Sequence, residues 1–120
     1  MSKLLIQLVT GPENSTRGAL AFLVAKTAAA QGHDVTMFLA GDGVSYLRDA
    51  TMDVAHGVGT GSIREHYTAL ADAGVPMYAS GMSSKTRAID AAALGGKAVE
   101  LVAPERLVEL IAEADRVVTY

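Results

Sequence analysis

The sequence predicts an α/β fold, a three-layer α/β/α sandwich in which helices cover both faces of a five-stranded parallel sheet. The main observation is an alternation of short apolar stretches with helical ones, which is typical of parallel sheets. The second is a composition of 50% hydrophobic and 19% charged residues, which is typical of a globular chain. Because the 120 residues contain no internal repeat or linker, we expect a single domain over residues 1–120.

The first strand and helix have clear boundaries. Residues 3–10 (KLLIQLVT) form an almost continuous apolar run, as in a strand that is buried on both faces. Gly11 and Pro12 end the strand, and Asn14 or Ser15 can cap a helix that continues to about residue 31. Helical spacing predicts that the buried face of this helix comprises four apolar residues: Leu20, Leu23, Val24 and Ala28.

The middle of the chain is less regular. Residues 35–40 indicate a second buried strand, and Asp42 in the following turn can cap a short helix. Residues 51–61 contain three glycines and are expected to form a surface loop. Residues 62–65 (SIRE) match a capping box, so a helix should begin there and end before Gly74.

The second half continues the alternation. Strands are expected at residues 75–79, 98–102 and 116–120, and one helix should continue from the loop at 80–87 to about residue 94. Pro104 suits the first turn of the last helix. The buried face of that helix is expected to comprise Leu107, Leu110 and Ile111.

Several classes of site are excluded by residue types. The chain has no cysteine, and therefore no disulfide, thiolate metal site or thiol nucleophile. The histidines at 33, 56 and 66 lack metal-ligand spacing, so we expect no metal. The glycines at 57, 59 and 61 follow no strand and lack the last glycine of the dinucleotide fingerprint, so we expect no cofactor.

The charge and hydropathy pattern limits the partners. A net charge of −3 with mixed signs does not favour nucleic acid as a partner. No run approaches the roughly 20 apolar residues of a membrane helix, so no membrane partner is expected. The first residues lack the pattern of a signal peptide, and we therefore expect a cytoplasmic protein.

The loop at 80–87 is the main candidate site. Right-handed crossovers place it with the loops at 10–17, 40–45 and 103–105 along the edge where parallel sheets bind ligands. Its serines can cap a helix, with Ser83 or Ser84 as the cap, or the loop can bind an anion with help from its cations. The candidate ligand-binding residues of this loop are Ser80, Gly81, Ser83, Ser84 and Arg87.

Two neighbouring loops add candidates of the same kind. Asp42 either caps its helix or presents a carboxylate at the ligand edge. Asn14 and Arg17 can face an anion or the solvent. No G-x-S-x-G motif or adjacent base supports a serine nucleophile.

Four segments of the chain resemble the DsrE/DsrF-like family, which includes sulfur-relay subunits of the YchN and TusD types. These segments are residues 10–17 (TGPENSTR), 38–44 (FLAGDGV), 78–87 (YASGMSSKTR) and 113–120 (EADRVVTY). The resemblance covers essentially the whole chain. It implies a five-stranded parallel sheet of flavodoxin-like general form, and homo- or hetero-oligomers that are often trimers or hexamers.

The resemblance also implies that this chain lacks the sulfur atom used by the sulfur-carrying members of the family. Sulfur-carrying members place a cysteine just after the third strand and an arginine seven residues later, and some have a second cysteine three residues after the first. The matching positions are Ser80, Arg87 and Ser83. Serine cannot carry a persulfide, so sulfur transfer is not expected here.

Three functions remain open at this point. The first is a DsrE-like protein without enzymatic activity that binds a small anionic ligand or a partner at the loop 80–87. The second is an enzyme that uses Asp42, His66 or a loop serine. The third is a structural subunit of a sulfur-relay complex whose partner carries the cysteine.

Overall fold

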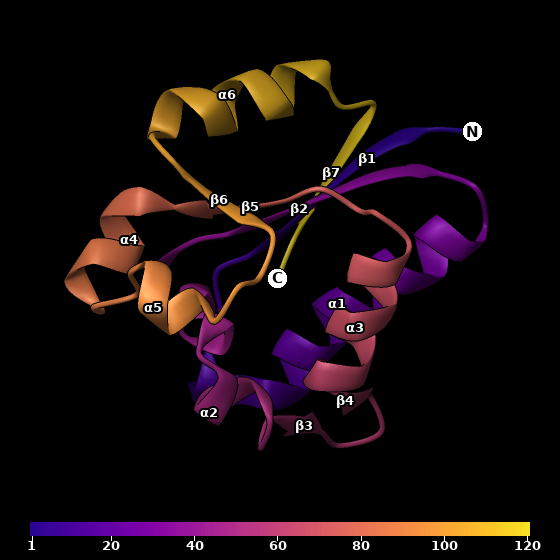
Figure 1. The fold of residues 1–120 in the computed structure, drawn as a ribbon. Helices are drawn as coiled ribbons and strands as arrows, with labels where there is room; N and C mark the ends of the chain where they lie inside the picture. Colours follow the sequence, from indigo (N-terminus) through magenta and orange to yellow (C-terminus); the bar gives the residue numbers. More distant parts are fainter.

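The computed structural model describes all residues from 1 to 120, and its centre is a five-stranded parallel sheet (Figure 1). The strands lie in the order β6-β5-β2-β1-β7, and every neighbouring pair is parallel. Their bounds are β1 (Lys3–Leu8), β2 (Asp34–Leu39), β5 (Met77–Ser80), β6 (Val99–Val102) and β7 (Arg116–Thr119). The predicted fold class is confirmed.

Helices cover the two faces of the sheet unequally. α1 (Ser15–Ala30) and α3 (Ile63–Asp72) lie on one face, and α6 (Pro104–Glu113) lies alone on the other (Figure 1). The shorter elements are η1 (Pro12–Asn14), η2 (Gly41–Leu47), α2 (Asp49–Met52), β3 (His56–Gly57), β4 (Gly61–Ser62), α4 (Gly81–Thr86) and α5 (Ala91–Leu94). The longest helix has 16 residues, and none combines the length and apolar character needed to cross a membrane.

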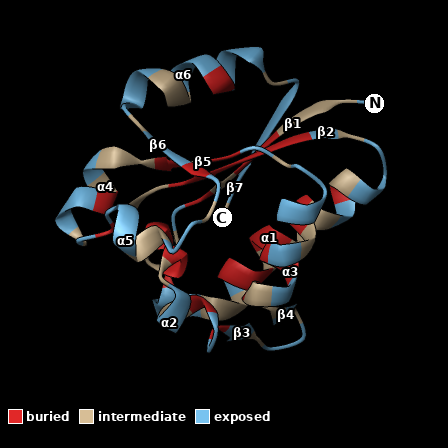
Figure 2. Cartoon of the chain, viewed as in Figure 1, coloured by how far each residue is buried: buried red, intermediate tan, exposed pale blue.

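The two faces hold cores of very different size. A cluster of 22 buried residues lies on the face of α1 and α3, whereas the α6 face has only Leu5, Phe38 and Leu110 (Figure 2). Leu107 packs against this small cluster as predicted, but Ile111 is 42% exposed. The predicted burial of Ile111 is therefore wrong. α6 packs against the sheet only, with no neighbouring helix beside it, so only a narrow row of its side chains is buried.

The buried face of α1 also differs from the prediction. Leu20, Leu23 and Val24 are only partly buried, and of the predicted stripe only Ala28 is buried. The buried residues are mostly small: Gly18, Ala19, Ala21, Phe22, Ala25 and Ala28. Close packing explains why these residues are small, since a Cβ atom added to Gly18 would lie 2.4 Å from the Tyr46 hydroxyl.

Two irregular regions were predicted incorrectly. Residues 51–61 include the end of α2 and most of the β3–β4 hairpin rather than a plain loop. The single helix expected after residue 80 is two short helices, α4 and α5. Ala88 lies between them with a φ of 54°, in the left-handed region, and so ends any continuous helix.

Candidate ligand site at the sheet edge

The loops after β1, β2 and β5 meet at the carboxyl edge of the sheet. Gly11 lies directly against the loop after β2, since a Cβ atom there would be 2.3 Å from the Asp42 carbonyl oxygen. The buried Tyr46 hydroxyl donates to the Gly11 carbonyl at 2.7 Å, and burial raises the pKa of Tyr46, which keeps it a neutral donor. The Gly41 N–H donates to Ser83 Oγ at 2.9 Å and so ties η2 to α4.

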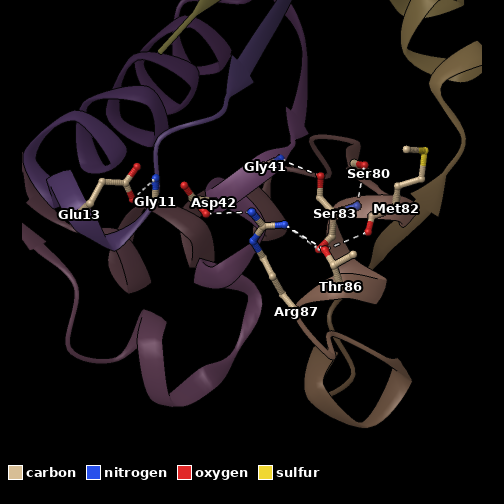
Figure 3. Close-up of polar contacts among 9 residues, drawn as sticks. All are labelled: Gly11, Glu13, Gly41, Asp42, Ser80, Met82, Ser83, Thr86 and Arg87. Atoms are coloured by element: carbon tan, nitrogen blue, oxygen red, sulfur yellow. Dashed lines mark hydrogen bonds and ion pairs between the residues drawn. The ribbon is translucent and has the colours of Figure 1, made fainter.

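An ion pair between Asp42 and Arg87 forms the centre of this edge (Figure 3). Arg87 Nη2 donates to Asp42 Oδ1 at 2.8 Å, while Nη1 donates to the Ser83 carbonyl at 3.1 Å and to Thr86 Oγ1 at 3.2 Å. The side chains of Arg87 and Asp42 are 32% and 60% exposed. The pair is therefore open to solvent, and an exposed pair of this kind contributes at most about 1 kcal/mol.

Of the two roles predicted for Asp42, the capping role is wrong. No side chain caps η2, whose N-cap residue is Ala40, and the Asp42 carboxylate turns instead to Arg87. The two residues are 45 positions apart in the chain. The structure thus brings together an acidic group and a basic group that the sequence placed only on neighbouring loops.

The serines of the loop divide into three situations. Ser80 caps α4 by accepting the Ser83 N–H at 3.1 Å, so the cap expected at Ser83 or Ser84 is wrong. Ser80 and Ser83 both accept an N–H and keep a hydroxyl proton to donate. Ser84 is fully buried, and its hydroxyl has no partner. Gly81 begins α4 beside Val102 at the end of β6.

One residue of this edge was missed by sequence reasoning. Arg48 Nη2 donates to the carbonyl oxygens of Arg87 at 2.8 Å and Ala88 at 3.0 Å. It therefore holds the end of α4 and positions the backbone from which the Arg87 side chain starts. No local signal could have found this contact, because the partners are 39 and 40 residues away in the chain.

Asn14 and Arg17 lie apart from the ion pair. Asn14 Oδ1 caps α1 by accepting the Arg17 N–H at 3.1 Å, so of the two predicted caps, Asn14 and Ser15, it is Asn14. Both residues line a separate groove beside β7. The candidate residues thus form two groups, one around Arg87 and one around Arg17.

His66 does not join the serines or Asp42. It is buried on α3, and its Nε2 lies 2.7 Å from the Thr60 carbonyl oxygen in the β3–β4 hairpin. No histidine is hydrogen-bonded to Ser80 or Ser83. No three side chains of the metal-ligating types form a cluster in the structure.

Comparisons with known proteins give one family and one fold. The model of the DsrE/DsrF-like family matches residues 2–120. The ychN protein from E. coli superposes over the full length of both chains with a TM-score of 0.84 at 22% identity. A conserved protein of unknown function from Bacteroides thetaiotaomicron, BT1422, gives a TM-score of 0.73 at 13% identity, covering 99% of this chain and 95% of that one. At such identities these likenesses show the fold alone. No curated protein matches the sequence.

Proposed function

The chain belongs to the DsrE/DsrF-like family, and on that premise we propose that it binds a small anionic ligand at the loop after β5. It contains no cysteine, and a persulfide requires a sulfur atom as its carrier. We therefore place the binding site at the loop where sulfur-carrying members of the family have their cysteine, and we expect reversible binding there instead of sulfur transfer.

The Asp42–Arg87 ion pair is the observation that supports this proposal. A phosphate, sulfate or carboxylate offers Arg87 the same acceptor geometry as the Asp42 carboxylate does now. Exchange of one acceptor for the other costs little, since an exposed pair contributes at most about 1 kcal/mol. The hydroxyl protons of Ser80 and Ser83 supply further donors on the same loop.

A cysteine-independent enzyme has less support from the geometry. Ser80 and Ser83 accept backbone N–H groups and have no base as a hydrogen-bond partner, and His66 bonds to the hairpin. A serine nucleophile needs such a base. Binding without chemistry fits these contacts better.

A structural role in an assembly is a second candidate, and the exposed apolar side chains of α6 favour it. Val108 and Ile111 are 64% and 42% exposed on the only helix of that sheet face. We propose that this helix joins copies of the chain into a homo-oligomer, with a trimer or hexamer as the expected form. A subunit of a sulfur-relay complex would use the same surface to bind its partner.

Isothermal titration with inorganic phosphate and with sulfate at low ionic strength tests the binding site. The Arg87→Ala variant should lose binding several-fold or more, since the charge-assisted bond to the anion is removed, and an exposed contact of this kind contributes up to about 1 kcal/mol. The Asp42→Asn variant should bind several-fold more tightly, because the competing carboxylate is gone, which is worth up to about 1 kcal/mol.

The matched control is Lys85→Ala. Lys85 is exposed on α4, two residues before Arg87, and takes part in none of the ion pairs. Equal losses in the Lys85 and Arg87 variants would mean unspecific attraction by positive charge and would contradict the proposed site. Absence of any binding to the wild-type chain would contradict it as well.

A further inference from the structure

A groove of about 520 Å³ lies beyond the carboxyl ends of β1 and β7, at the point where the direction of the sheet connections changes. The chain leaves β1 into α1 on one face and enters β7 from α6 on the other (Figure 1). Parallel α/β sheets bind their ligands in the crevice at such a switch point. The groove is lined by Asn14, Thr16, Arg17, Leu20, Thr119 and Tyr120.

Arg17 gives the groove an unpaired positive charge. Each of the other five arginines places its guanidinium against a carboxylate, a carbonyl or a hydroxyl. The Arg17 guanidinium alone makes no hydrogen bond or ion pair, and the side chain is exposed. No side-chain carboxylate lines the groove. The main-chain carboxyl oxygen of Tyr120 accepts the Val9 and Thr10 N–H groups at 2.9 and 3.4 Å. The Arg17 guanidinium is therefore the group of the groove that attracts an anion.

The rest of the lining includes two apolar side chains, Leu20 and Tyr120. Leu20 is only partly buried, and the Tyr120 ring packs against the large core while its hydroxyl has no partner. The Tyr120 N–H donates to the Gln7 carbonyl, and the Tyr120 carbonyl oxygen accepts the Val9 N–H. These two bonds fix the backbone that carries the ring. A flat or branched apolar body can lie against these two side chains while its charged end reaches Arg17.

We propose that this groove binds a small organic anion. Its carboxylate or phosphate group pairs with the Arg17 guanidinium, and its apolar body lies on Leu20 and Tyr120. This site is separate from the one at Arg87 and selects a different ligand. An inorganic anion is enough to pair with Arg87, whereas the groove also offers apolar contacts that only an organic anion can make. The two sites also differ in their residues, so either one can fail without the other.

An amide NMR titration with phenyl phosphate, benzoate and inorganic phosphate tests the proposal. Phenyl phosphate or benzoate should shift the resonances of residues 14–20 and 119–120 and bind at least fivefold more tightly than inorganic phosphate. The phenyl phosphate and benzoate arms distinguish a phosphate ligand from a carboxylate ligand. Arg17→Gln should weaken binding of the tighter compound at least tenfold.

Two further variants separate the contributions of charge and apolar contact. Leu20→Ala should weaken the aryl compounds several-fold and leave the affinity for inorganic phosphate unchanged. Lys26→Gln, a change of charge further along α1 and outside the groove, should leave all affinities unchanged.

Three results would overturn the proposal. The first is no binding of either aryl compound, as would follow if a second copy of the chain covered the groove. The second is equal affinity for aryl and inorganic anions. The third is a set of shifts confined to residues 80–87 that Arg87→Ala abolishes and Arg17→Gln does not, which would assign all binding to the other site.

Discussion

At the scale of single residues, Asp49 connects three parts of the chain. Its carboxylate accepts bonds from Arg64 at 2.7 Å and from Lys97, whose side chain is only 4% exposed. Lys97 also donates to the Leu94 carbonyl at 3.0 Å, and Arg64 to Asp53 at 2.8 Å. The bonds from Arg64 and Lys97 lower the pKa of Asp49 from its usual value near 4 to about 2.

This pKa shift predicts a pH dependence of stability. Because the folded-state pKa of Asp49 is depressed, its contribution is complete above about pH 4 and is lost as the pH falls towards about 2. The Asp49→Asn variant should be less stable at pH 7, and its difference from wild type should shrink over that interval. Urea unfolding at several pH values measures the difference.

Asp72→Asn is the control for this experiment, since Asp72 is an exposed carboxylate outside the ion pairs. Its difference from wild type should stay small at every pH. If the Asp49 variant kept a constant difference down to pH 2, the two basic partners would not stabilise the charged carboxylate.

The residues of the candidate site show what the sequence could and could not predict. The alternation of strands and helices placed Asp42, Ser80 and Arg87 on loops of the same edge, because all strands are parallel. Which serine caps α4 was not predictable, since three serines within five positions could each accept an N–H group. The partners of Arg87 and Arg48 depend on packing between segments about 40 residues apart, which local patterns do not contain.

At the scale of elements, the break between α4 and α5 comes from tertiary contacts. Residues 82–94 contain no glycine or proline, and this is why the sequence predicts one continuous helix. Arg48 binds the carbonyls of Arg87 and Ala88, and Asp90 starts α5 by accepting the Ala93 N–H at 2.9 Å. The segment between the two helices is therefore held by a side chain from another loop.

Ala88 predicts a stabilising substitution. Its φ of 54° lies in the left-handed region, which costs a residue with a Cβ atom about 1–2 kcal/mol. Ala88→Gly should therefore raise the free energy of unfolding by up to about 1 kcal/mol, after the greater flexibility of glycine in the unfolded chain is subtracted. Urea or thermal unfolding measures the change.

Ala92→Gly provides the matched comparison, because Ala92 is exposed inside α5. There glycine should destabilise by about 0.5–1 kcal/mol. Opposite signs at the two positions are expected; destabilisation at both would mean that residue 88 is not strained.

The helix α1 shows a limit of periodicity. Apolar residues occur around most of its circumference, so spacing alone does not decide which face is buried. The face that lies against the core is the one with Gly18 and Ala25, because small side chains allow close approach. The larger Leu20 is left free to line the groove beside β7.

At the scale of the whole molecule, the uneven cover of the sheet predicts a surface for assembly. The double substitution Val108→Asp and Ile111→Asp places charges on the exposed apolar row of α6. If the homo-oligomer forms through this helix, the variant should have the mass of a single chain, 12.4 kDa, while the wild type has a multiple of it. Light scattering coupled to size-exclusion chromatography measures both masses.

Val58→Asp is the control, since Val58 is 87% exposed in the turn of the hairpin, away from α6. It should keep the mass of the wild-type assembly. A wild-type chain that is monomeric, or a double variant that keeps its assembly, would contradict a contact through α6.

The pairing of β1 with β7 has a consequence for how the chain reaches this fold. β1 lies inside the sheet, but its second edge pairs only with residues 116–119, and the Lys3 N–H bonds to a carboxylate 112 positions later. At about 5–20 residues per second, a ribosome needs on the order of ten seconds to supply that partner. During synthesis this edge of β1 therefore stays unpaired until residues 116–119 have been made, although its other edge can already pair with β2.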